Sequence, residues 1–233
     1  MTANASPRVV SLVPSATETL SAWGVTPMAC TRYCERPDLV HVGGTKNPDI
    51  DAIIALAPDL VVLDRHENRR PDAEALAAAG IELVVLDVNA FTTLNDEMTT
   101  LATAVGLPAP APISPPTPVV DLRAIVPIWR RPWMTIGART YGSDLLAALG
   151  VHNVFADAEV DYPEVSIAEM AAKKPDVILI PSEPYVFTDE HLGELTDMAP
   201  CVRVDGQDLF WWGDRTAGAL TRLASTLTAM ASP

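Results

Sequence analysis

Hydrophobic and polar positions divide the chain into two alternating kinds of segment. Short apolar runs such as Leu60–Leu63 and Val177–Ile180 have the pattern of strands that are buried on both faces. Longer segments with apolar residues at helical spacing lie between such runs, and many end at a glycine or a proline. This alternation predicts an α/β protein with parallel sheets flanked by helices.

An internal repeat carries this pattern twice. Residues 49–59 and 166–176 each begin with a helix N-cap, Asp49 or Ser166, and keep nine residues from the cap to a proline. In both copies the proline ends a helix, and a buried strand follows. The repeat predicts two lobes, an N-terminal α/β lobe over residues 1–106 and a C-terminal α/β lobe over residues 120–233.

Helix N-caps and the glycines that end helices predict the other elements of both lobes. Arg8–Val13 is predicted as a strand, and Ser15 with Glu18 forms a capping box for a helix that ends at Gly24. The same reasoning predicts helices over residues 71–79, 93–105, 140–149, 189–195 and 215–230, with strands at 81–86 and 201–204.

A proline-rich segment separates the two lobes. Six of the twelve residues from Leu107 to Pro118 are proline, which excludes an α-helix and favours polyproline II. At ~3.1 Å per residue the segment reaches roughly 37 Å. We therefore predict that residues 107–119 form a semi-rigid inter-lobe linker.

Parallel sheets bind ligands beyond the carboxyl ends of their strands, so two facing lobes predict a site in the cleft between them. Asp205–Asp214 places three consecutive aromatics between two glycines and is predicted to be a loop. Trp129 and Trp133 lie in another turn-like stretch. Aromatic faces on loops favour a flat, partly apolar ligand. The alternative is that these indoles cap the core under long loops.

Composition limits the function classes. The net charge of −14 argues against nucleic acid as a partner, and no apolar run approaches the ~20 residues that a membrane span needs. Three cysteines, an odd number, suit a reducing compartment, and residues 1–7 contain no export signal. We therefore expect a cytoplasmic, monomeric protein that does not insert into a membrane.

The sequence predicts no catalytic residues and no intrinsic cofactor. Ser11 and Ser15 lack the glycine context of a nucleophile elbow. Cys30 and Cys34 have no neighbouring histidine with zinc-ligand spacing. His66 and Glu67 are adjacent on a loop and are weak candidates for a metal site, with solvated surface as the alternative.

Several motifs resemble the class III, helical-backbone periplasmic binding proteins, and above all their cobalamin-binding branch. They are the segments 8–18, 31–34, 42–48, 162–166, the Pro-Asp-Leu-Val-Val strand entry and the tryptophan loop before the last helix. The resemblance implies a two-lobed, non-catalytic binding protein for a corrinoid or another metal chelate, of cobalamin, haem or siderophore type. A cofactor-processing enzyme or chelatase on the same fold, or a ligand-sensing module, remains the alternative.

Carried over position by position, the resemblance places ligand-binding side chains in both lobes. They are Pro14, Ser15, Tyr33, Lys46, Asn47, His66, Glu67, Trp129, Arg130, Glu183, Tyr185, Phe210, Trp211 and Trp212.

The chain also departs from the family. The long helix between the lobes is replaced by the proline-rich segment, and Arg69-Arg70 stands where relatives present an acidic residue to an ABC permease. Arginine against a basic permease pocket costs free energy, which argues against docking on an ABC permease.

Overall fold

The computed structural model describes residues 7–231, and these separate into two compact units. Unit 1 contains residues 7–88, 92–112 and 212–214, and unit 2 contains residues 89–91, 113–211 and 215–231. Each unit is an α/β structure with its own parallel sheet, as the sequence predicted. Within residues 7–231 no helix is long and apolar enough to cross a membrane.

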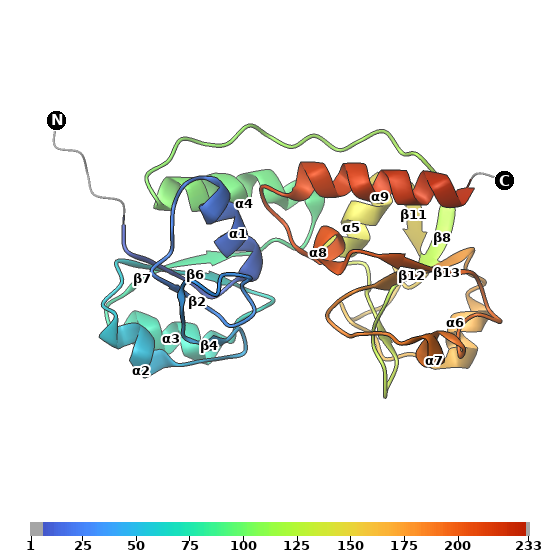
Figure 1. Cartoon of the computed structure of the whole chain (residues 1–233), viewed down its shortest axis with the longest axis horizontal. Coiled ribbons are helices and arrows are strands. Elements are labelled where there is room, and N and C mark those ends of the chain that lie inside the picture. Colours follow the sequence, from blue (N-terminus) through green and yellow to red (C-terminus); the bar gives the residue numbers. More distant parts are fainter. Residues whose placement is uncertain (1–6, 232–233) are drawn as a thin grey trace. The chain divides into compact units, whose positions relative to one another are not determined.

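The sheet of unit 1 has five parallel strands in the order β3-β2-β1-β6-β7. All five residues of β6 are buried, because β6 pairs with β1 on one side and β7 on the other and helices cover both faces (Figure 1). The strands are β1 (Val9–Ser11), β2 (Ala29–Cys30), β3 (Val40–His41), β6 (Leu60–Asp64) and β7 (Glu82–Leu86). The helices are α1 (Pro14–Ala22), α2 (Ile50–Ala55), α3 (Arg70–Ala78) and α4 (Phe91–Ala104). A small antiparallel hairpin pairs β4 (Gly43–Gly44) with β5 (Asn47–Pro48).

The sheet of unit 2 has four parallel strands in the order β11-β8-β12-β13. These are β8 (Leu122–Ile125), β11 (Val151–Asn153), β12 (Val177–Pro181) and β13 (Cys201–Val204), and an antiparallel hairpin pairs β9 (Pro127–Trp129) with β10 (Met134–Thr135). Helices lie on both faces of this sheet (Figure 1). They are α5 (Tyr141–Ala148), α6 (Ile167–Ala172), α7 (Asp189–Leu192), α8 (Gly206–Phe210) and α9 (Thr216–Ala231).

The internal repeat is present in the structure. Asp49 caps α2 by accepting the Ala52 amide at 3.0 Å, and Ser166 caps α6 with a full capping box. Both helices end through a left-handed residue immediately before the proline, Ala57 at φ 47° and Lys174 at φ 49°. Equivalent positions therefore share the backbone turn that leads each helix into its strand.

An arginine–aspartate pair fixes each strand start in the same way. The Arg8 amide donates to the Asp59 carboxylate at 2.8 Å, and the Asp59 amide donates back to the Arg8 carbonyl at 2.9 Å. In unit 2 Arg123 and Asp176 make the same two bonds, both at 2.8 Å. The aspartate after the proline is thus the link between neighbouring strands.

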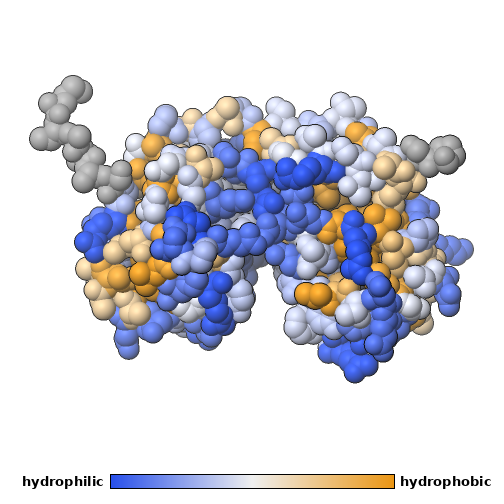
Figure 2. Space-filling model, viewed as in Figure 1, coloured by the Kyte–Doolittle hydropathy of each residue, from blue (hydrophilic) through white to orange (hydrophobic). Residues whose placement is uncertain are grey.

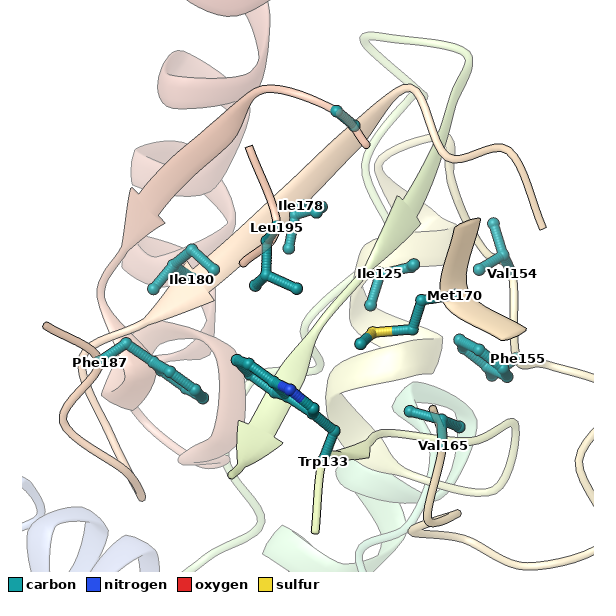
Figure 3. Close-up of a cluster of buried hydrophobic side chains, with 11 residues drawn as sticks. Ile125, Trp133, Val154, Phe155, Val165, Met170, Ile178, Ile180, Phe187 and Leu195 are labelled. Atoms are coloured by element: carbon teal, nitrogen blue, oxygen red, sulfur yellow. The ribbon is translucent and has the colours of Figure 1, made fainter. Parts of the chain in front are cut away.

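One hydrophobic cluster in the core of unit 2 contains Trp133 and Phe187. Figure 3 shows the indole of Trp133 beside the ring of Phe187, and the two rings are stacked with centroids 5.7 Å apart. Trp133 is only 8% exposed, so its indole caps the core. For this tryptophan the alternative given above, a structural role under a loop, is therefore the one that the structure supports.

Two local predictions were wrong. The N-cap of α1 is Val13, and Pro14 occupies the first turn, so Ser15 lies inside the helix and forms no capping box. A proline fits the first helical position because its missing N–H has no partner there in any case. Residues 205–214 are not all loop, since Asp205 caps the short helix α8 by accepting the Gln207 amide at 2.9 Å.

Residues 107–121 form neither helix nor strand, so the proline-rich segment contains no α-helix, and its polyproline II conformation and its role as a linker stay predictions.

Candidate functional site

A buried polar network shapes the loop that follows β6 in unit 1. The Asn68 carboxamide accepts the Asp64 amide at 2.8 Å and donates to the Leu12 carbonyl at 3.2 Å and the Thr45 carbonyl at 2.9 Å. One side chain therefore ties together the ends of β1 and β6 and the β4–β5 hairpin. Sequence reasoning did not single out Asn68, because its partners are as far as 56 residues away.

The Asp64 carboxylate orders the two residues predicted as a weak metal site. Its Oδ1 accepts the amides of His66 at 2.8 Å and Glu67 at 3.3 Å. Burial raises the pKa of Asp64 above its ordinary value, and these backbone hydrogen bonds oppose that shift. The His66 ring lies 3.0 Å from the Asp87 carboxylate. Within residues 7–231 no group of three or more histidine, cysteine, aspartate or glutamate side chains could hold a metal ion.

Gly44 lets three polar or aromatic side chains meet at the hairpin. A Cβ at this position would lie 2.6 Å from Asn47 Oδ1 and 3.0 Å from Tyr33 Cε2. Tyr33 is 53% exposed, and the Arg32 guanidinium lies 5.0 Å from its ring centroid. The fold thus brings together the predicted site residues Tyr33 and Asn47, which are far from each other in the sequence.

The remaining predicted residues of unit 1 differ in accessibility. Lys46 is exposed and donates to the His66 carbonyl, which joins the hairpin to the β6–α3 loop. Pro14 and Ser15 are buried, and Ser15 is only 1% exposed. Their side chains are held inside unit 1, so the prediction that they line the ligand site is the weakest of the set.

In unit 2 the loop after β12 positions an indole. The Trp211 Nε1–H donates to the Glu183 carboxylate at 2.7 Å, and the Arg215 guanidinium lies 5.5 Å from the Trp211 ring centroid. Gly206 permits this arrangement, because a Cβ there would lie 2.5 Å from Glu183 Cγ. The half-buried indole is thereby held at its N–H by Glu183 and at its ring by the Arg215 guanidinium.

The same loop supports a second tryptophan. Trp129, at the end of β9, is 46% exposed and meets Tyr185 edge-on, with ring centroids 5.1 Å apart and planes at 71°. Tyr185 also lies 4.8 Å from Phe187 and 5.6 Å from His191, measured between ring centroids. The exposed indole therefore stands on a continuous aromatic cluster that reaches the core.

Arg130 is engaged by a neighbouring carboxylate. Its guanidinium pairs with Glu194, which also accepts the Trp133 Nε1–H at 3.2 Å. The ion pair holds the pKa of Glu194 below its ordinary value. Since the partner is 64 residues away, sequence reasoning had no means to foresee that this arginine is already paired.

The three aromatic side chains of the segment 210–212 differ in how deeply they are buried. Phe210 is half-buried, and its ring packs against Gly142, where a Cβ would lie 3.2 Å from Phe210 Cδ1. Trp212 is only 2% exposed and belongs to unit 1. The expectation that Trp212 offers a ligand face therefore fits this structure poorly, whereas Trp211 keeps an accessible ring.

A buried carboxylate supports the α8–α9 region below Trp211. Asp208 is 2% exposed and accepts hydrogen bonds from Arg222 at 2.6 Å and Arg215 at 3.1 Å. The pKa of Asp208 lies below its ordinary value, mainly because Arg222 donates hydrogen bonds to the carboxylate. Arg215 thus joins Asp208 to the Trp211 ring, a supporting role that the sequence did not reveal.

Hydrophilic residues dominate the face shown in Figure 2, and hydrophobic residues appear there as separate patches. Large apolar side chains do reach the surface of unit 2, including Val186 at 76% and Val160 at 55% exposed. Val186 lies in the same loop as Glu183 and Tyr185, so this loop combines apolar, aromatic and acidic groups.

Comparison with known proteins supports the resemblance. Residues 9–111 match the periplasmic binding protein family. The vitamin B12-binding protein of Salmonella paratyphi A is 27% identical over 193 residues, covering 76% of this chain and 73% of the relative. That of Yersinia pestis is 28% identical over 201 residues, covering 76% and 70%.

Solved structures share the fold. The periplasmic vitamin B12 binding protein BtuF of Vibrio cholerae superposes with a TM-score of 0.78 at 21% identity, covering 98% of this chain and 99% of that one. The periplasmic haem-binding protein RhuT of Roseiflexus sp. RS-1 gives 0.77 at 21% identity, covering 97% and 100%.

The prediction of a cytoplasmic location is wrong. The matched family is one of periplasmic binding proteins, and the two solved structures named above are of periplasmic proteins that bind vitamin B12 and haem. An odd cysteine number was a poor guide, because one free thiol beside one pair is compatible with an oxidising compartment.

Proposed function

Because residues 9–111 belong to the periplasmic binding protein family, we propose that this protein binds a corrinoid or a haem without chemically changing it. The similarity to vitamin B12-binding proteins over 76% of the chain supports this class of ligand. Both candidates are large, flat metal chelates with an apolar ring and polar edges, which aromatic side chains recognise through stacking.

One observation carries the proposal. The loop between β12 and α7 holds two accessible tryptophans at once, Trp211 through Glu183 and Trp129 through Tyr185. Exposed indoles are costly in water unless they have a partner, and fixing them beforehand lowers the entropy lost on binding. The loop that holds both indoles follows the carboxyl end of the parallel strand β12, where ligands bind in such sheets, and rigid aromatic faces suit a planar ligand.

Unit 1 contributes polar contacts in this proposal. Tyr33, Lys46 and Asn47 surround the β4–β5 hairpin, and His66 and Glu67 follow β6. Hydroxyl, ammonium and carboxamide groups can bind the amide or carboxylate substituents at the rim of a tetrapyrrole. Arg130, Phe210 and the buried Pro14, Ser15 and Trp212 support the fold around the site in this account rather than contacting the ligand.

The prediction that this chain does not dock on an ABC permease rests on Arg69 and Arg70, and both arginines are paired in the structure. Arg69 pairs with Asp72 at 2.9 Å and Arg70 with Glu74 at 2.8 Å, both along α3. Because these arginines are exposed, the surface of α3 presents both charge signs. We propose that this surface is a poor docking site for a basic permease pocket, because arginines stand where the resemblance implies an acidic residue.

Isothermal titration calorimetry tests the proposal directly. The purified chain is titrated separately with cyanocobalamin, haem, a ferric siderophore and, as a control for flat apolar dyes, metal-free protoporphyrin. We expect saturable binding at one site for cyanocobalamin or haem. Equal, non-saturating heats for all four ligands would show that the protein is not a binding protein for this class.

A further inference from the structure

Unit 1 contains a pair of cysteines that the ligand site does not use. Cys30 ends β2, and Cys34 closes the turn that follows, in which the Cys34 amide donates to the Thr31 carbonyl at 3.1 Å. The two side chains are buried, at 0% and 3% exposed. The third cysteine, Cys201, lies in β13 of unit 2.

Polar groups surround the sulfur of Cys34. Its Sγ lies 3.2 Å from Thr17 Oγ1 and 3.3 Å from Thr31 Oγ1. The hydrogen bond with the Cys30 thiol lowers the pKa of Cys34 most, and with the two threonines it brings that pKa to about 6. The same bond and burial raise the pKa of Cys30. The pair therefore has one sulfur suited to attack and one that keeps its proton.

We propose that Cys30 and Cys34 are a disulfide-forming pair, oxidised to an intramolecular bond in the oxidising compartment in which relatives of this fold work. The bond closes a short ring that contains Thr31, Arg32 and Tyr33. It fixes the turn that presents Tyr33 beside Gly44 and Asn47. This inference does not depend on the identity of the ligand.

The oxidation proceeds by thiol–disulfide exchange with a small disulfide such as oxidised glutathione or with the disulfide of an oxidoreductase. The Cys34 thiolate attacks one sulfur of that disulfide, forms a mixed disulfide and releases the first thiolate. Cys30 then gives its proton to the released thiolate and attacks Cys34 Sγ, which releases the second thiolate, and that thiolate takes up a proton from solvent in place of the one that Cys34 lost on ionisation. Two protein thiols are oxidised and one external disulfide is reduced to two thiols.

Burial sets the conditions under which this exchange takes place. A disulfide reagent cannot reach sulfurs that are 0% and 3% exposed until the turn opens. We therefore expect slow oxidation of the folded reduced protein and rapid oxidation during refolding. Cys201 is more accessible and has no neighbouring thiol to complete an intramolecular exchange within residues 7–231.

The test uses the full chain with Cys201→Ser, which leaves only the proposed pair. The reduced protein is refolded with oxidised and reduced glutathione, denatured in the presence of an alkylating reagent, and examined by intact mass spectrometry and tryptic mapping. Trypsin cleaves after Arg32, between the two cysteines, and not after Arg36, which precedes Pro37. A Cys30–Cys34 bond therefore leaves the peptides 9–32 and 33–46 joined until a reductant separates them.

We expect monomeric protein with no alkylated thiol and a mass about 2 Da below that of the reduced form, because two hydrogens are lost. The wild-type chain should then carry one alkyl group, on Cys201. Two alkylated thiols in Cys201→Ser, or glutathione adducts and disulfide-linked dimers in place of the joined peptides, would overturn the proposal. The wild-type chain carries no substitution, so its single alkyl group on Cys201 distinguishes the proposed bond from a failure of Cys201→Ser to fold.

Discussion

Trp211 donates its indole N–H to the Glu183 carboxylate at 2.7 Å. This bond joins the end of helix α8 to the loop after β12. Two residues further along that loop, Tyr185 supports Trp129 edge-on. A single loop therefore sets the orientation of two accessible indoles. The structure gives a physical reason why these two tryptophans, among the five in the chain, are proposed to meet the ligand.

Replacing Glu183 with alanine should weaken ligand binding with little change in the fold. The substitution removes the acceptor that orients Trp211, and a hydrogen bond to a charged group contributes about 1.5–3 kcal/mol. We expect the affinity for the preferred tetrapyrrole to fall at least tenfold in calorimetry. Val160→Ala, which trims a side chain that is 55% exposed elsewhere in unit 2, should bind like the wild type.

Trp129 and Trp133 should respond in opposite ways to truncation. Trp129→Ala removes an indole that is 46% exposed, so affinity should fall by about 1–3 kcal/mol while the urea midpoint changes little. Trp133→Ala empties a core position that is 8% exposed and should cost about 3–5 kcal/mol of stability. A stable Trp133 variant with lost affinity would reverse these two assignments.

The two tryptophans also show what the sequence can and cannot predict. The repeated cap-to-proline unit predicted the parallel α/β architecture, because the caps at Asp49 and Ser166 and the strands after them are local features. Whether an indole on a turn faces solvent or core depends on distant partners. Phe187 stacks on Trp133 from 54 positions along the chain, and Glu194 reaches Arg130 from 64 positions away.

The short helix α8 was missed for a different reason. Gly206 and Gly213 favour a loop by propensity, whereas Asp205 offers an N-cap and Asp208 finds two arginines from the following segment. Tertiary contacts outweighed local preference at this point. The Asp205 cap is nevertheless a local sequence signal for the start of a helix.

Asn68→Ala should destabilise unit 1 more than an exposed asparagine substitution. The change leaves the Asp64 amide and the carbonyls of Leu12 and Thr45 without this partner in a buried setting. Buried unsatisfied groups cost about 1–3 kcal/mol each, and partial relaxation should leave a total loss of about 2–5 kcal/mol. Urea denaturation measures this loss, and the exposed Asn47→Ala, expected within about 0.5 kcal/mol of wild type, is the control.

Asp208 should give unit 2 a defined dependence on pH. Its pKa is lowered in the folded state, so the carboxylate stabilises the fold above the unfolded pKa of about 3.9, and this contribution is lost as pH falls through the lower folded pKa. At pH 7 Asp208→Asn should cost about 1–3 kcal/mol, because Arg215 and Arg222 lose their charged partner.

The difference between wild type and Asp208→Asn should therefore shrink in urea titrations taken from pH 7 to pH 3. Asp189→Asn is the matched control, since its ion pair with Arg203 involves a carboxylate side chain that is 97% exposed. A cost for Asp208→Asn that stays constant over this pH range would contradict the assigned ion pair.

We propose that Trp129 and Trp211 together receive a flat tetrapyrrole. The most direct measurement is a calorimetric titration of cyanocobalamin and haem into the wild type and into the Trp129→Ala/Trp211→Ala double variant, with Val160→Ala as control. We predict saturable binding by the wild type and the control and a loss of affinity of at least a hundredfold in the double variant, with its urea midpoint preserved. Wild-type affinity in a folded double variant would show that these two indoles do not receive the ligand.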